Sequence, residues 1–292
     1  MNGMTSQTDG NPSGHSPPQD ASASLHPERS RTRGRLILVP NALDLGNEAG
    51  DLREVLPDGV LRTAAGLIHW VVEDARSTRA FLKRVSSVHP LVVPLQSLHI
   101  VELPRRPKGR ASPSSPTNPD RSRDPASAWQ ALLAPALAGH DIGLLSEAGL
   151  PAVADPGALL VEEAHRARLD VLTLPGPSAL VLALAASGLQ GQQFAFVGYL
   201  PQDADARARR IRELETLSRK SDQTQLLIET PYRNEAVLHA LLSHLSPSSR
   251  LSISIGMTLP GGFSRTESVA QWRKSPPGLS DRMPAVFAFL GR

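Results

Sequence analysis

The stretch Ser146-Glu-Ala-Gly-Leu-Pro-Ala-Val-Ala-Asp-Pro-Gly157 follows an apolar run, Ile142 to Leu145, and precedes a helical pattern. We therefore expect a long loop that leads from a strand into a helix. Pro151 and Pro156 fix φ while two glycines free the backbone, so the loop should keep one shape. Asp155 suits a helix N-cap and Pro156 the first helical position. Open α/β sheets bind ligands at the carboxyl ends of parallel strands, so this loop is a candidate ligand site, with a rigid connector as the alternative.

The composition is typical of a globular protein with room for two domains, since the chain has 292 residues, of which 40% are hydrophobic and 20% charged. The absence of Cys excludes disulfides, thiolate nucleophiles and Cys-ligated zinc, and it fits a reducing compartment. No apolar run approaches the length that a bilayer requires. We therefore expect a cytoplasmic protein that has no membrane contact.

Positive charge is concentrated in two low-complexity segments. Residues 1–34 are rich in Ser, Pro, Gly and Asn and lack the apolar core of a signal peptide, so we predict a disordered tail. Residues 104–128 are predicted to be a flexible basic insertion with a net charge of +4, whereas the chain as a whole carries +3. These segments predict attraction to nucleic acid, and a solvated insertion without a partner is the alternative.

Short aliphatic runs alternate with helical patterns along the rest of the chain. Before a polar, Gly-rich stretch at 188–193, strands are expected at 36–40, 69–73, 91–95, 142–145 and 170–174. After it, strands are expected at 194–200, 224–228, 251–255 and 284–290, with an arginine-rich helix at 206–217. The predicted fold class is α/β, with an N-terminal α/β domain at 35–188 and a C-terminal α/β domain at 189–292.

Several other chemistries lack their motifs. No Gly-x-Gly-x-x-Gly follows the first strand and no Walker loop is present, which argues against dinucleotide-binding and P-loop enzymes. The Gly176-Pro-Ser-Ala-Leu180 segment lacks the second Gly of a nucleophile elbow. The nine His are scattered, so no metal site is expected.

Four motifs occur in order: the 146–157 stretch, Leu174-Pro-Gly-Pro-Ser-Ala-Leu180, Phe196-Val-Gly-Tyr-Leu-Pro201 and Glu229-Thr-Pro-Tyr-Arg233. Together they resemble the tetrapyrrole methylase superfamily of S-adenosylmethionine-dependent methyltransferases. The nearest branch is the small-subunit ribosomal RNA ribose-methylating type I enzymes, and the resemblance covers roughly 36–290. It implies two α/β domains with a cofactor cleft between them.

The chain departs from that branch at three places. Pro40-Asn-Ala-Leu-Asp-Leu-Gly46-Asn47 replaces a Pro-Thr-Pro loop, and Glu73-Asp-Ala-Arg-Ser-Thr78 replaces Glu-Asp-Thr-Arg-His-Thr. Thr258-Leu259 replaces Thr-Lys and so loses a cation. The chain therefore resembles a divergent member of the superfamily.

The resemblance implies that S-adenosyl-L-methionine binds in the cleft. The residues that should line it are Pro40, Ser146, Glu147, Ala148, Gly149, Val153, Ala154, Asp155, Pro177, Ser178, Ala179, Thr230, Pro231, Tyr232, Pro284 and Ala285. A hydroxyl acceptor must lose a proton, which makes Glu73, Asp74 or Glu147 a candidate base. Arg76 and Arg233 are candidate phosphate anchors. The structural alternative is that Asp74 caps a helix and Arg76 makes a surface pair.

The predicted function is a methyltransferase that acts on RNA, at a ribose 2′-hydroxyl of ribosomal RNA, with RNA or a ribosomal particle as partner. One alternative is a cofactor- or RNA-binding protein that has lost catalysis, which the altered first loop and the missing Lys motivate. The other is a methylase of a tetrapyrrole or another small molecule. The resemblance also implies a homodimer, to which Ile211, Leu214 and Leu217 of the helix at 206–217 could contribute unless they pack within their own domain.

Overall fold

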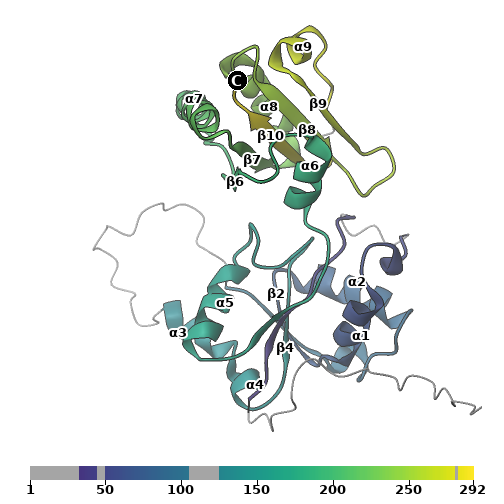
Figure 1. The fold of residues 1–292 in the computed structure, drawn as a ribbon. Helices are drawn as coiled ribbons and strands as arrows, with labels where there is room; N and C mark the ends of the chain where they lie inside the picture. Colours follow the sequence, from purple (N-terminus) through teal and green to yellow (C-terminus); the bar gives the residue numbers. More distant parts are fainter. Residues whose placement is uncertain (1–32, 45–49, 105–124, 280–281) are drawn as a thin grey trace, which may run out of the picture. The chain divides into compact units, whose positions relative to one another are not determined.

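The computed structural model describes residues 33–44, 50–104, 125–279 and 282–292. Within these ranges the strands form two five-stranded sheets, one from each half of the chain (Figure 1). This agrees with the predicted α/β fold class. Most of the predicted tail (1–32) and of the predicted insertion (105–124) lies outside the described residues.

The first sheet is parallel throughout and has the order β3-β2-β4-β1-β5. Its strands are β1 (Leu36–Leu38), β2 (His69–Val72), β3 (His99–Glu102), β4 (Ile142–Leu145) and β5 (Val171–Thr173). All five strands therefore end at the same edge, and the loops that follow β1, β2, β4 and β5 meet there.

Alternation along β1 explains why this sheet is covered on both faces. Ile37 and Val39 point into a core shared with α1 (Asp58–Gly66) and α2 (Ala75–Ser86), while Leu36 and Leu38 point into a second core. The helices of the second core are α3 (Pro125–Ala131), α4 (Ala134–Leu137) and α5 (Gly157–Arg166). Figure 1 shows the two groups of helices on opposite sides of the sheet.

The second sheet is mixed and has the order β6-β7-β10-β8-β9. Its strands are β6 (Phe194–Phe196), β7 (Thr224–Glu229), β8 (Arg250–Ile255), β9 (Phe263–Ser268) and β10 (Ala285–Leu290). Strand β10 runs antiparallel to both β7 and β8, whereas β6 is parallel to β7. The carboxyl ends of β6, β7 and β8 therefore lie at the same edge as the start of β10.

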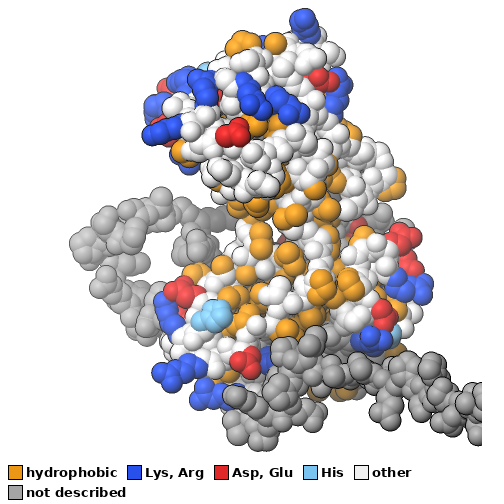
Figure 2. All heavy atoms as spheres, viewed as in Figure 1, with side chains coloured by type: hydrophobic (Ala, Val, Ile, Leu, Met, Phe, Trp, Pro, Cys, Tyr) orange, Lys and Arg blue, Asp and Glu red, His pale blue; other side chains and the backbone are white. Residues whose placement is uncertain are grey.

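Helices cover both faces of the second sheet. On one face, Leu227 and Phe287 pack with residues of α7 (Ala204–Ser221) and α8 (Asn234–His244), and Trp272 of α9 (Val269–Lys274) belongs to the same core. On the other face, Leu226 and Val286 pack against α6 (Ala179–Ser187). Basic side chains gather on the surface over α7 (Figure 2).

Three local predictions are wrong. Residues 91–95 form no strand, since Pro94 precedes a short 3-10 turn (Leu95–Ser97) and the strand begins only at His99. Strand β8 was expected to be half-buried, but Ser252 and Ser254 are buried as well, because their face lies beneath α6. Helix α5 begins at Gly157, one residue after the predicted position.

The boundary between the two domains, placed at residues 188 and 189, falls between the last strand of the first sheet and the first strand of the second. That boundary stays a prediction. Among the described residues, no helix combines the length and the apolar character needed to cross a membrane.

Candidate active site

The 146–157 stretch forms the loop from β4 to α5, and its backbone is held in an unusual shape. Gly149, Ala152 and Ala154 have φ of 69°, 66° and 65°, in the left-handed region that alanine rarely adopts. Asp155 Oδ1 accepts the N–H groups of Ala152 at 3.1 Å and Gly157 at 2.7 Å. Asp155 therefore stabilises both the strained turn and the first N–H of α5, although the N-cap position is occupied by Pro156 and not, as predicted, by Asp155.

Asn41 ties this loop to the loop that follows β1. Its backbone exchanges two hydrogen bonds with Gly149, at 2.9 and 3.2 Å. Its Nδ2 donates to the carbonyl oxygens of Ser146 at 3.2 Å and Glu147 at 2.9 Å, while its Oδ1 accepts the N–H of Ala42 at 2.9 Å. In its described part, residues 40–44, the divergent first loop is therefore tied to the 146–157 stretch through a buried asparagine.

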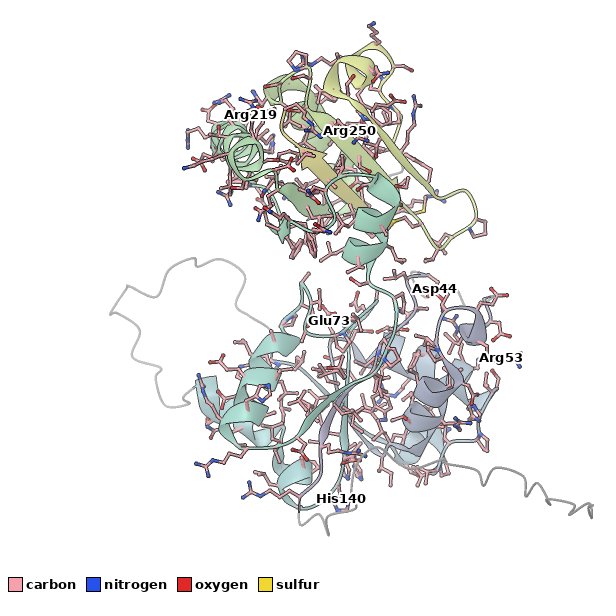
Figure 3. The ribbon with its side chains drawn as sticks, in the orientation of Figure 1. Asp44, Arg53, Glu73, His140, Arg219 and Arg250 are labelled. Carbon is pink, nitrogen blue, oxygen red and sulfur yellow. The ribbon has the colours of Figure 1, made fainter. Side chains whose placement is uncertain are left out.

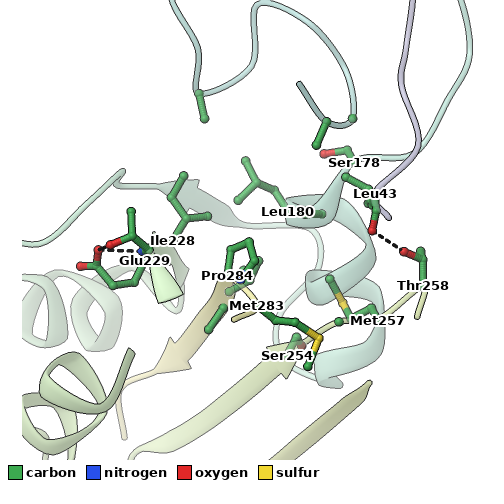
Figure 4. Close-up of a pocket in the computed structure, with 18 of the residues that line it drawn as sticks. Leu43, Ser178, Leu180, Ile228, Glu229, Ser254, Met257, Thr258, Met283 and Pro284 are labelled. Carbon is green, nitrogen blue, oxygen red and sulfur yellow. Dashed lines mark hydrogen bonds between the residues drawn. The ribbon is translucent and has the colours of Figure 1, made fainter. Parts of the chain in front are cut away.

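A pocket of about 340 Å³ lies beside these loops, within the usual size range of small-molecule sites (Figure 4). Its walls combine loops from both sheets. From the first half of the chain they comprise Leu43, Ala148, Gly149, Leu150, Val153, Ala154, Ser178, Ala179 and Leu180. From the second half they comprise Tyr199, Ile228, Glu229, Thr230, Pro231, Ser254, Gly256, Met257, Thr258, Leu259, Met283, Pro284, Ala285 and Val286.

One buried carboxylate faces this largely apolar pocket. Glu229 is 1% exposed, and its Oε1 accepts the backbone N–H of Thr230 at 2.8 Å. Its Oε2 lies 3.2 Å from Arg233 Nη2 but makes no hydrogen bond with any described residue. A buried oxygen with spare acceptor capacity on a pocket wall suits a hydroxyl or ammonium group of a ligand.

Three carboxylates gather at the carboxyl ends of β2 and β4, where Figure 3 labels Glu73. Glu73 Oε2 accepts the backbone N–H of Glu147 at 3.1 Å. Burial raises the pKa of Glu147, and the negative charges of Glu73 and Asp74 raise it further. In contrast, the backbone N–H of Ser77, which donates to Asp74 Oδ1 at 2.6 Å, lowers the pKa of Asp74. Glu147 is therefore the stronger base of these two.

The sequence profile of the family described as Tetrapyrrole (Corrin/Porphyrin) Methylases matches residues 78–255, which is more than half of the chain. The chain belongs to the tetrapyrrole methylase family. Proteins of this family are S-adenosylmethionine-dependent methyltransferases.

The chain is also similar to proteins named ribosomal RNA small subunit methyltransferase I. It is 40% identical to the Vibrio cholerae protein over 104 residues, which are 36% of this chain and 35% of the relative. It is 35% identical to the Synechocystis protein over 129 residues, 44% of this chain and 45% of the relative. The matched segment thus spans less than half the length of either relative.

Two solved structures share the fold. The methyltransferase CobJ gives a TM-score of 0.52 at 15% identity, covering 89% of this chain and 94% of that chain. A conserved hypothetical protein from Aeropyrum pernix K1 gives a TM-score of 0.54 at 15% identity, and the match covers 89% of this chain and 85% of that protein. Both agree with the two-sheet architecture of a tetrapyrrole methylase.

Many of the predicted cofactor residues of this tetrapyrrole methylase lie on the pocket wall. They are Ala148, Gly149, Val153, Ala154, Ser178, Ala179, Thr230, Pro231, Pro284 and Ala285. Those that do not line it are Pro40, Ser146, Glu147, Asp155, Pro177 and Tyr232. Asp155 shapes the loop from behind, and Pro40 packs so closely on Gly176 that a Cβ there would lie 2.3 Å from the proline Cβ. The binding roles themselves stay predictions.

The candidate catalytic residues divide into three groups. Glu73 and Glu147 are in contact through the hydrogen bond described above. Asp74 caps α2, as the structural alternative expected, and Arg76 is exposed in the first turn of that helix. Arg233 donates to the carbonyl oxygens of Leu200 at 3.2 Å and Pro201 at 3.4 Å, so its guanidinium holds two loops together, and its role as a phosphate anchor stays a prediction.

The wall residues that the sequence reasoning missed come mainly from β7, β8 and the start of β10. Glu229, Gly256 and Met283 are far apart in sequence but meet because β10 is antiparallel to its neighbours. The turn signal around Gly256, whose φ is 54°, was the available clue to the β8 loop. Thr258, one of the divergent positions, lines the pocket and donates to the Leu43 carbonyl oxygen at 2.9 Å (Figure 4).

Proposed function

We propose that this tetrapyrrole methylase transfers a methyl group from S-adenosylmethionine to a ribose 2′-hydroxyl of ribosomal RNA. The single observation that carries the proposal is the pocket, whose walls are built from the motif loops. The choice of RNA as the acceptor is supported by the relatives, whose names describe methylation of small-subunit ribosomal RNA.

The pocket residues fit the cofactor. Aliphatic side chains such as Leu180 and Ile228 give an apolar wall for an adenine ring, and the fixed loop at 148–149 offers backbone groups that lose little entropy on binding. Glu229 Oε2, which is ion-paired with Arg233 but makes no hydrogen bond within the described residues, offers an acceptor to the ammonium group of the ligand. When bound, S-adenosylmethionine supplies an activated methyl group, so the protein has chiefly to position the acceptor.

Glu147 is our candidate general base. A hydroxyl group that accepts the methyl group must lose its proton, and a nearby base has to take that proton up. The Glu147 carboxylate can accept that proton because its pKa is raised toward the working pH. Glu73 holds the Glu147 backbone through the 3.1 Å hydrogen bond and so positions the base.

The exposed face of α7 supports an RNA partner. Arg209, Arg212 and Lys220 line one surface groove, which Glu213, Thr216 and Leu217 line as well. Positions three and four residues apart share a helix face, and this row extends about 16 Å along the axis. Neither Arg209 nor Lys220 makes an ion pair within the described residues. Unpaired cations in a row suit the phosphates of a nucleic acid strand.

The homodimer remains a proposal, and the surface that supports it is a different one from the predicted helix at 206–217. Of the three predicted interface residues of α7, Ile211 and Leu214 are buried in their own core and only Leu217 is exposed. On the opposite face of the second sheet, Val181 of α6 and both phenylalanines of β6 are exposed. An exposed apolar surface of this kind suits a two-fold contact with a second copy. Light scattering of the full chain at micromolar concentration should therefore give a dimer mass, and a monomer mass would contradict the dimer.

Labelled methyl groups test the proposed function. The full chain is incubated with S-adenosylmethionine labelled in its methyl group and with small ribosomal particles, followed by digestion of the RNA to nucleosides. We expect label in ribose-methylated nucleosides. Label in an added tetrapyrrole instead of RNA would favour the small-molecule alternative, and cofactor binding without transfer to any acceptor would favour a lapsed enzyme.

A further inference from the structure

The chain has two tyrosines, and both are exposed beside the pocket. Tyr199 lines the pocket and is 53% exposed. Tyr232 is 83% exposed and directly follows Pro231, which lines the pocket. Aromatic side chains usually bury most of their surface, so two exposed rings beside one pocket mark a surface that a ligand covers.

The two rings belong to neighbouring loops. Tyr199 follows β6 and Tyr232 follows β7, and these strands are parallel partners. Arg233 joins the loops through its hydrogen bonds to the carbonyl oxygens of Leu200 and Pro201. Each tyrosine is therefore one residue away from this connection, and the backbone that carries the rings is fixed.

The chemistry of Tyr199 favours the use of its ring rather than its hydroxyl. Burial raises the pKa of Tyr199, and the negative charges of Glu229 and Glu73 raise it further, so the phenol stays protonated at neutral pH. A protonated phenol cannot accept the proton that the ribose hydroxyl loses. Among the described residues, no aromatic ring stacks on either tyrosine, and both side chains keep more than half of their surface exposed.

We propose that Tyr199 and Tyr232 form a stacking site for unpaired bases of the RNA acceptor, beside the pocket that holds the cofactor. This inference rests on the proposed function. A base that has been turned out of its stack needs an aromatic surface, and stacking on Tyr is tolerant of base identity. The same pair holds the acceptor nucleotide at the pocket, with Glu147 left to accept the hydroxyl proton. Tyr232 thus serves the acceptor rather than the cofactor, which agrees with its position off the pocket wall.

The test compares Tyr199→Ala and Tyr232→Ala with Tyr199→Phe and Tyr232→Phe in the full chain. Binding is measured with a single-stranded oligoadenylate that carries one fluorescent aminopurine, since its emission reports stacking. Each Ala variant should bind the RNA about 5-fold to 150-fold more weakly, with an unchanged dependence on salt. Each Phe variant should stay within about threefold of the wild type, because its ring still stacks.

Calorimetry with S-adenosylmethionine and thermal unfolding provide the controls. Tyr232→Ala should bind the cofactor like the wild type and unfold at the same temperature, because its side chain contacts solvent. Wild-type RNA binding that both Ala variants retain would overturn the stacking site and leave the methyltransferase proposal intact. Absence of RNA binding by the wild type would overturn both. Equal losses in the Ala and Phe variants would assign the effect to the hydroxyl groups and overturn stacking.

Discussion

Asp155 offers a test of how the central loop is held. Its Oδ1 accepts two backbone N–H groups, while its Oδ2 is buried without a hydrogen-bond partner among the described residues. Burial raises the pKa of Asp155 to about 6, the negative charge of Glu73 adds to this, and the N–H groups oppose it. The substitution Asp155→Asn keeps the acceptor oxygen and removes the titration.

The direction in which stability changes with pH depends on whether the folded or the unfolded chain binds more protons. Between about pH 4 and about pH 6 the folded chain holds a proton on Asp155 that the unfolded chain has released, so the free energy of unfolding falls as pH rises through this window. The full shift corresponds to about 3 kcal/mol. Because the carboxyl group is partly exposed, screening by solvent reduces the effect to about 1–2 kcal/mol.

Urea unfolding of the wild type and Asp155→Asn across this pH range measures the effect. The stability of the variant relative to the wild type should rise by about 1–2 kcal/mol between about pH 4 and about pH 7, on top of a constant offset from the buried amide. Asp205→Asn, at an exposed position of α7, is the matched control and should show only a small change. A difference that is flat with pH, or that grows as pH falls, would refute the assignment of a raised pKa.

Three further predictions concern the base, the RNA surface and the packing of the loops. Glu147→Gln should lower the rate of methyl transfer about 100-fold or more in single-turnover assays with unchanged cofactor affinity, and an unchanged rate would exclude Glu147 as the base. Replacing both Arg209 and Lys220 by Gln should reduce the slope of log Kd for RNA against log salt by about 1.5, whereas an unaltered slope would remove α7 from the RNA surface. Gly176→Ala should lower the free energy of unfolding by about 2 kcal/mol or more, because its Cβ would lie 2.3 Å from a proline carbon. Gly59→Ala in α1, whose Cβ would meet nothing within 4 Å, should raise it by up to about 1 kcal/mol. Urea titrations of both variants measure these changes, and two changes of the same sign would contradict the prediction.

The sequence predicted four of the five strands of the parallel sheet, and β3 was missed; the central strands were found because they carry continuous aliphatic runs. Leu36–Leu38 and Ile142–Leu145 are buried on both faces, and such runs remain visible without any tertiary information. Helix α2 was found for a similar reason, since Asp74 caps it and Phe81, Leu82 and Val85 repeat on one face. Strand β9 was missed because Phe263–Ser268 is largely polar and depends on its pairing with β8.

The pocket was only half predictable for a topological reason. Sequence motifs pointed to loops after parallel strands, and Gly149 and Ser178 of these loops lie on the pocket wall. The opposite wall needs β10 to run antiparallel between β7 and β8, and no local pattern reports that order. The buried position of Glu229 and the role of Asn41 likewise arise from contacts between segments about 30 to 100 residues apart in the chain.

Titration of S-adenosylmethionine into the full chain by calorimetry tests the central claim most directly, because every step proposed here requires the pocket to hold that cofactor. We predict saturable binding with one site per chain, and weaker binding after Asn41→Ala, which removes the side-chain hydrogen bonds to the Ser146 and Glu147 carbonyl oxygens. The absence of any binding heat at millimolar cofactor, from a chain whose urea unfolding is cooperative, would contradict the account.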